Sequence, residues 1–144
     1  MGKTAQDAAG FGSFSINVGI GLKTPLNPID KNRSCGGSSG GAAGFTKLAE
    51  IQNIKHIAIG ESTGGSIACP ASFCGVYGLT PTYGLVSRYG LIDYGNSLDK
   101  LGPITSTVKE AAIALSVISS HDPKDSTSIN TPIPNYEKSL NKPN

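Results

Sequence analysis

The chain has 144 residues and a formal net charge of +2, with 38% hydrophobic and 15% charged residues. This balance argues against a disordered chain, and no apolar run is long enough to cross a bilayer, so we expect no membrane association. The basic residues are scattered along the chain, which argues against a nucleic-acid-binding surface of its own.

The three cysteines are Cys35, Cys69 and Cys74. An odd number of thiols argues against a disulfide framework and favours a reducing compartment, so we expect a cytoplasmic protein, with a mitochondrial one as the alternative. Cys69 and Cys74 are not spaced like a pair of zinc ligands, and no histidine lies near them in the sequence. We therefore expect no metal site.

The first predicted helix begins at Ser38 or Ser39 and runs through Ala49. A serine hydroxyl at this position accepts a hydrogen bond from an otherwise unpaired backbone N–H of the first turn, which predicts a cap. The β-branched run Ile54–Ile59 follows and is bounded by residues that break regular structure, so it predicts a buried strand. A glycine turn comes next.

Beyond that turn, Ile67–Phe73 is expected to form a short helix and Val76–Leu79 a strand. The clearest helix is predicted over Ile104–Ser119, where Thr107 and Glu110 have the spacing of a capping box. The polar, proline-containing residues 122–144 are expected to be mostly loop. Strands that alternate with helices indicate an α/β fold.

The stretch Gly60–Ala68 is rich in glycine and serine, which is typical of a tight turn and also of a catalytic site built around a serine. Gly64 and Gly65 have no Cβ, so their backbone can approach a substrate closely, and their N–H groups can stabilise a developing oxyanion next to Ser66. An ordinary glycine-rich turn explains the same residues. A second Ser/Gly cluster, Cys35–Gly41, lies on the other side of the predicted strand and favours the site.

Together these motifs resemble the amidase signature family. Gly-Gly-Ser-Ser-Gly-Gly at 36–41, Thr-Gly-Gly-Ser-Ile at 63–67 and Pro-Ala-Ser-Phe-Cys-Gly at 70–75 carry the resemblance. The segments 78–91, 97–99, 102–103 and 121–127 are similar to one branch, the glutamyl-tRNA(Gln) amidotransferase A subunits. The similarity runs from about residue 27 to about residue 140 and implies that residues 1–144 are the central part of an amidase signature domain. The family fold is α/β, a mixed sheet flanked by helices, and is only partly represented here.

The resemblance implies a Ser–cis-Ser–Lys mechanism. Ser66 matches the nucleophile that forms an acyl ester, and Ser38 matches the relay serine, held by a cis bond after Gly37 and expected within hydrogen-bond reach of Ser66. Gly37 and Ser39 match positions that support this relay. The family's base is a lysine upstream of the serine pair, and no lysine here matches its motif, although Lys3 and Lys23 lie upstream.

Thr63, Gly64 and Gly65 match the turn that forms the oxyanion hole and binds substrate. Two positions depart from the family pattern. Ser62 stands where an acidic residue is usual, and Ala68 stands where an arginine supports the active-site loop. The loss of that arginine puts full activity in question.

The branch hydrolyses glutamine and passes the ammonia to glutamyl-tRNA(Gln) held by the complex. The resemblance therefore implies B-type and C-type partner subunits, with ATP and Mg²⁺ used by a partner and no cofactor in this chain. A free-standing amidase acting on small amides is the alternative enzyme. A non-catalytic fragment or interaction module is the alternative from another class, because the matching lysine is missing.

Overall fold

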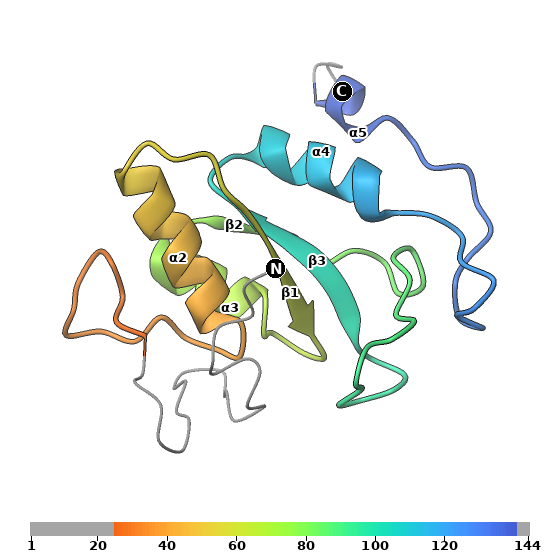
Figure 1. The fold of residues 1–144 in the computed structure, drawn as a ribbon, viewed down its shortest axis with the longest axis horizontal. Coiled ribbons are helices and arrows are strands. Elements are labelled where there is room, and N and C mark those ends of the chain that lie inside the picture. The colour runs from red at the N-terminus through yellow and green to blue at the C-terminus, as the bar shows by residue number, and fades with distance from the viewer. Residues whose placement is uncertain (1–24, 141–144) are drawn as a thin grey trace.

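A three-stranded antiparallel sheet organises the part of the chain that the computed structural model describes, residues 25–140 (Figure 1). Its strands are β1 (Ile57–Ser62), β2 (Tyr77–Gly78) and β3 (Lys100–Thr105), in the order β1-β3-β2. Helices cover the sheet, which confirms the α/β class. Every pairing between these described strands is antiparallel.

Helices lie on both sides of this sheet (Figure 1). On one side are α2 (Gly40–Ile51) and α3 (Ala68–Cys74), and on the other is α4 (Val108–Ile118), followed by the four-residue α5 (Tyr136–Ser139). The core on the α2 side is made of small and β-branched residues, namely Cys35, Ala42, Ala43, Ile67, Cys74 and Ile104. Small side chains let α2 and α3 pack close to the sheet. No helix within residues 25–140 combines the length and apolar character needed to span a bilayer.

The first strand is present but is shifted from its predicted bounds, 54–59 to 57–62. The prediction that it is buried is wrong for its beginning, because Ile57 is 44% exposed, and Ile54, which precedes the strand, is 55% exposed. Strand β1 lies at the edge of the described sheet. The buried residues of β1 are instead Gly60 and Ser62, next to the glycine turn.

The central strand β3 was not predicted. Ile104 and Thr105 were assigned to the start of a helix, but both belong to β3 and are fully buried. The helix starts at Val108, where Thr107 and Glu110 form the predicted capping box. The predictions of a short helix after Ser66 and of a mostly irregular segment after residue 122 are confirmed within the described residues.

The capping box at α4 provides a test of this boundary. The Thr107 hydroxyl accepts a hydrogen bond from the Glu110 N–H at 3.2 Å, and the Glu110 carboxylate accepts one from the Thr107 N–H at 3.1 Å. We expect Thr107→Ala to lower the free energy of unfolding by about 1 kcal/mol, because the N-cap hydroxyl is lost. Thr107→Ser keeps the hydroxyl and should behave like the wild type in urea denaturation. Equal stability of the two variants would contradict the cap.

Candidate active site

The segment before α2 has an unusual backbone. The bond between Gly37 and Ser38 is cis, as predicted. Gly37 is buried, and Ser38 is half-buried and carries an interaction of its own. The chain therefore presents the first serine of the Ser-Ser pair at a partly accessible position, immediately before α2 begins at Gly40.

Ser39 joins this segment to the second serine motif. Its backbone N–H donates to the Ser66 carbonyl at 3.1 Å, and its hydroxyl donates to the Glu61 carbonyl at 3.3 Å. The prediction of a serine cap on α2 is wrong for Ser39, because this N-cap residue makes no side-chain cap hydrogen bond. The hydroxyl is directed to β1 instead. Two turns that are 27 positions apart in the sequence are thereby held side by side.

The turn that carries Ser66 and the helix after it pack against two glycines of the sheet, Gly60 and Gly78. A Cβ at Gly60 would lie 2.8 Å from the Ser39 hydroxyl oxygen and 3.0 Å from Ile67 Cγ1. A Cβ at Gly78 would lie 2.9 Å from Ile67 Cγ2 and 2.7 Å from the Ala71 Cβ. A side chain at Gly78 would overlap the rigid Ala71 Cβ, and one at Gly60 would displace the Ser39 hydroxyl, so both glycines allow the turn and α3 to pack closely on the sheet. Ile67 fills the space between the two glycines and is fully buried.

The other end of the turn is held by Asp99. The Thr63 hydroxyl donates to one Asp99 carboxylate oxygen at 2.5 Å, and the other oxygen accepts from the backbone N–H groups of Tyr94 and Gly95 at 2.7 and 2.8 Å. Burial raises the pKa of Asp99, but the hydrogen bonds from Thr63, Tyr94 and Gly95 together hold it below the ordinary value. No role was predicted for Asp99, although it lies in segment 97–99, which is part of the family resemblance. The local feature of the sequence that could have drawn attention to Asp99 is its position directly before the apolar strand β3.

The structure thus brings the predicted residues at 37–39 to the predicted residues at 63–66. Ser66, Thr63 and Gly65 are half-buried and Gly64 is exposed, so a substrate can reach this turn from solvent. The roles of these residues remain predictions. Of the three lysines that precede Ser38, Lys3 and Lys23 lie outside the described residues, and Lys31 is exposed.

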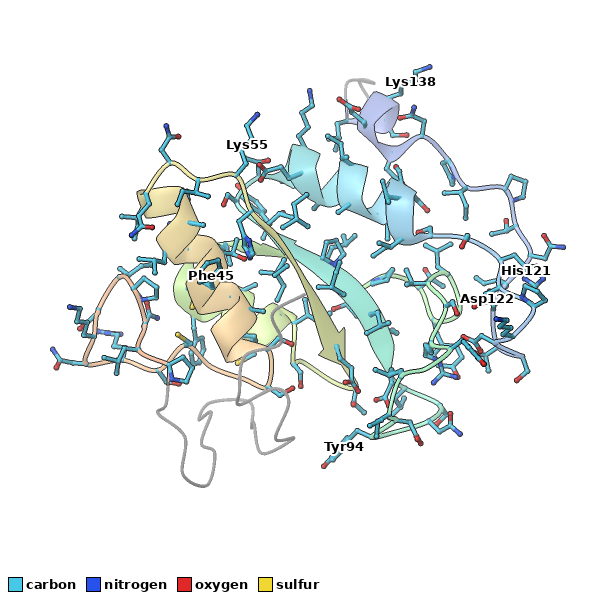
Figure 2. The ribbon with its side chains drawn as sticks, in the orientation of Figure 1. Phe45, Lys55, Tyr94, His121, Asp122 and Lys138 are labelled. Carbon is cyan, nitrogen blue, oxygen red and sulfur yellow. The ribbon has the colours of Figure 1, made fainter. Side chains whose placement is uncertain are left out.

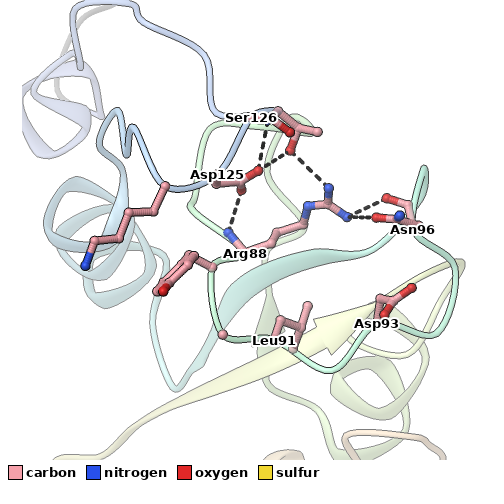
Figure 3. Close-up of a pocket in the computed structure, with 10 residues that line it drawn as sticks. Arg88, Leu91, Asp93, Asn96, Asp125 and Ser126 are labelled. Atoms are coloured by element: carbon pink, nitrogen blue, oxygen red, sulfur yellow. Dashed lines mark hydrogen bonds between the residues drawn. The ribbon is translucent and has the colours of Figure 1, made fainter.

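A second polar cluster surrounds Arg88 at a cavity of about 350 Å³ (Figure 3). The Arg88 guanidinium donates to the Asn96 carbonyl and, at 3.0 Å, to the Thr127 hydroxyl, while its backbone N–H donates to Asp125 at 2.7 Å. These bonds join the loop that follows β2 to the loop that follows α4. The cavity is lined by Arg88, Tyr89, Gly90, Leu91, Asp93, Asn96, Lys124, Asp125, Ser126 and Thr127.

Neither histidine is part of the site. His56 packs edge-to-face against Phe45, with ring centroids 4.8 Å apart, and His121 lies in the exposed loop at the edge of the molecule (Figure 2). Within residues 25–140, no three His, Cys, Asp or Glu side chains gather closely enough to hold a metal ion. None of the three cysteines is in a disulfide, and Cys74 donates a weak hydrogen bond to the Cys35 carbonyl in the core.

The family model and the similar sequences point to the same protein family. The sequence matches the Amidase family over residues 1–144. It is 52% identical over 140 residues to the glutamyl-tRNA(Gln) amidotransferase A subunit of Trichodesmium erythraeum, covering 97% of this chain and 28% of the relative. The protein of the same name from Syntrophobacter fumaroxidans is 48% identical over 143 residues, covering 99% and 28%. The chain therefore spans about 28% of the length of these curated relatives.

Solved structures give the same picture. The glutamyl-tRNA(Gln) amidotransferase A subunit from Thermotoga maritima is 44% identical, with a TM-score of 0.78 over 87% of this chain and 27% of that chain. The peptide amidase from Stenotrophomonas maltophilia is 33% identical, with a TM-score of 0.72 over 92% and 28%. A bacterial aryl acylamidase of the amidase signature enzymes is 31% identical, with a TM-score of 0.75 over 90% and 26%.

The contact between Gly60 and Ser39 predicts a non-additive pair of substitutions. Gly60→Ala should lower the free energy of unfolding by roughly 1–3 kcal/mol, because the new methyl group overlaps the Ser39 hydroxyl. Ser39→Ala removes that oxygen and relieves part of the overlap. The double variant should therefore lose less stability in urea denaturation than the sum of the two single losses. Strict additivity would show that the two residues do not meet.

The lowered pKa of Asp99 predicts a specific response to acid. A carboxylate with a depressed native pKa contributes stability that is fully present above its unfolded pKa, about 3.9, and is lost as the pH falls through the native pKa. Asp99→Asn lacks this contribution. Urea denaturation from about pH 7 to about pH 3 should therefore show a stability difference from wild type that narrows on acidification.

The other aspartates with depressed pKa values, Asp30, Asp122 and Asp125, are present in both proteins and cancel in the difference. Arg88 also lowers the pKa of Asp99 and is likewise unchanged. A stability difference that stays constant or widens toward low pH would contradict the assignment of a depressed pKa to Asp99.

Proposed function

Because the chain belongs to the amidase family, we propose that Ser66 is the nucleophile of an amide-hydrolysing site and that the site serves a tRNA-dependent amidotransferase. The observation that carries the proposal is the 3.1 Å hydrogen bond from Ser39 N–H to the Ser66 carbonyl, which holds the two serine turns together. Sequence identities of 52% and 48% to curated glutamyl-tRNA(Gln) amidotransferase A subunits support the amidotransferase branch of the family.

The proposed chemistry begins at the side-chain amide of glutamine. Ser66 Oγ attacks the amide carbon and loses its proton to the Ser38 hydroxyl, which passes a proton on to the base. The carbonyl oxygen becomes an oxyanion, and in this proposal the backbone N–H groups of the Thr63–Ser66 turn stabilise it. The C–N bond then breaks, and the leaving nitrogen takes a proton and departs as ammonia. Water hydrolyses the remaining glutamyl ester and returns Ser66 to its resting state.

The base in this scheme is a lysine held neutral by burial. The family places it upstream of the serine pair, and the lysines of this sequence that lie upstream of that pair include Lys3 and Lys23. The mechanism requires no metal or cofactor from this chain. In the proposed complex, ATP and Mg²⁺ are used by a partner protein.

The proposed partners follow from the names of the relatives, which are subunits of an assembly. We propose that ammonia released at Ser66 is used on glutamyl-tRNA(Gln) bound to a B-type subunit, with a C-type subunit completing the complex. None of the three cysteines is in a disulfide, which is consistent with a reducing compartment, and we propose that the protein is cytoplasmic.

A free-standing amidase is the second candidate. The peptide amidase and the aryl acylamidase, at 33% and 31% identity, show that similar folds occur in proteins with these names. The higher identity to the amidotransferase subunits favours glutamine as the donor. A non-catalytic role for this chain is the third candidate.

Ammonia release from glutamine tests the proposal. In the full protein, assembled with any partner proteins that copurify with it, Ser66→Ala should lower the rate by roughly 10⁴-fold or more, because the nucleophile is lost. Ser38→Ala should lower it by roughly 10²–10⁴-fold, because proton transfer is lost. Ser72→Ala changes an exposed serine on α3 and is the matched control, so it should leave the rate unchanged.

Three results would contradict the assignment. Full activity of the Ser66→Ala variant would show that Ser66 is not the nucleophile. Faster hydrolysis of simple amides than of glutamine, abolished by Ser66→Ala, would favour the free-standing amidase. No ammonia release from any amide would favour the non-catalytic role.

A further inference from the structure

Asp99 is a buried carboxylate that holds one end of the candidate oxyanion turn. It is the last residue before β3, its side chain has no exposed surface, and its two oxygens accept three hydrogen bonds. One bond comes from the Thr63 hydroxyl, and two come from backbone N–H groups of the loop that precedes β3. Because a buried charge is costly unless it is well hydrogen-bonded, this set of donors explains how Asp99 stays ionised inside the protein.

The pairing of β1 with β3 sets this contact. Ser62 is the last residue of β1 and lies opposite Lys100, the first residue of β3. Thr63 and Asp99 are the next opposed pair, one step beyond the end of the ladder. Their side chains therefore meet where the backbone of β1 leaves the sheet to form the turn. The 2.5 Å hydrogen bond between these side chains continues the contact between the two chain segments beyond the last backbone pair of the ladder.

A second observation shows that Thr63 is enclosed by the loop as well as hydrogen-bonded to Asp99. A Cβ at Gly95 would lie 2.8 Å from the Thr63 Cγ2 methyl group. The loop therefore passes against the methyl side of Thr63 while Asp99 holds the hydroxyl side. Both substituents of the Thr63 Cβ are in contact, which fixes the rotamer of this residue.

We propose that Asp99 is a positioning residue for the oxyanion turn, acting through the Thr63 hydroxyl. The proposal rests on the proposed function of Ser66. The turn is held at Thr63 by Asp99 and at Ser66 by the Ser39 N–H, and the Gly65 carbonyl accepts a hydrogen bond from the Cys69 N–H at 2.8 Å. Glycine has no side chain to restrain its backbone, so the Gly64 N–H, which directly follows Thr63, depends on the position of Thr63 for its direction. Asp99 itself does not touch the substrate.

The alternative explanation is that Asp99 only caps the loop at Tyr94 and Gly95. Thr63→Val separates the two explanations. This substitution is nearly isosteric and removes the hydroxyl, while both backbone hydrogen bonds to Asp99 remain. Thr63→Ser restores the hydroxyl without the methyl group and serves as the conservative rescue.

The experiment is steady-state glutamine hydrolysis by the full protein, assembled with any partner proteins that copurify with it. Thr63→Val should lower kcat and kcat/KM by similar factors of roughly 10–100, because a misdirected oxyanion donor affects the transition state more than substrate binding. Thr63→Ser should recover most of the loss. Asp99→Asn should resemble Thr63→Val, and the double variant should be no slower than the slower single variant.

A matched hydroxyl–carboxylate pair provides the control. Ser87 donates to Asp122 at 2.6 Å in a different pair of loops, so Ser87→Ala removes a similar bond without touching the turn. It should leave kcat unchanged. Urea denaturation of every variant accounts for loss of folded protein, and Thr63→Val keeps the test valid if Asp99→Asn does not fold.

An unchanged kcat for Thr63→Val, with activity still abolished by Ser66→Ala, would overturn the positioning role and leave the proposed function intact. A loss of kcat in Ser87→Ala equal to that in Thr63→Val would also overturn it. Activity that survives Ser66→Ala would instead overturn the proposed function on which the inference rests.

Discussion

The site depends on the close approach of the Ser39 segment to β1 at Gly60. Only an absent side chain at Gly60 leaves room for the Ser39 hydroxyl and for Ile67 against the sheet. With that space available, Ser39 reaches both Glu61 and Ser66, and the cis-bonded Ser38 directly precedes the residue that makes both contacts. Packing at Gly60 therefore contributes to the geometry of the site, since an extra methyl group there would overlap the Ser39 hydroxyl that bonds to Glu61.

Features determined by local sequence were predicted well. The capping box at Thr107 and Glu110 involves residues three positions apart, and the structure contains it. The central strand β3 was missed because its neighbours, β1 and β2, lie far away in the sequence. A proline is uncommon inside a strand, yet the Pro103 carbonyl accepts from Leu79 and the residue pairs with Ile59. Non-local pairing outweighed local preference at these positions.

The candidate site also contains features that local sequence predicts and contacts that depend on distant residues. The serines and glycines at 36–41 and 63–66 are recognisable as motifs, and the cis bond was predicted from them. The contacts of Ser39 and Asp99 were not, because each depends on a partner more than twenty positions away. Ser39, one of the two serines expected to cap α2, instead bonds to β1 through its hydroxyl. Asp99 became significant only when the pairing of β1 with β3 placed it beside Thr63.

The central claim is that Ser66, supported by the segment at 37–39, forms a glutamyl ester during turnover. The most direct test is mass spectrometry of the full protein quenched with acid while it turns over glutamine. The account predicts a glutamyl ester on the peptide that contains Ser66, and its absence from Ser66→Ala. Ammonia release without any ester, or an ester on a different residue, would contradict the account.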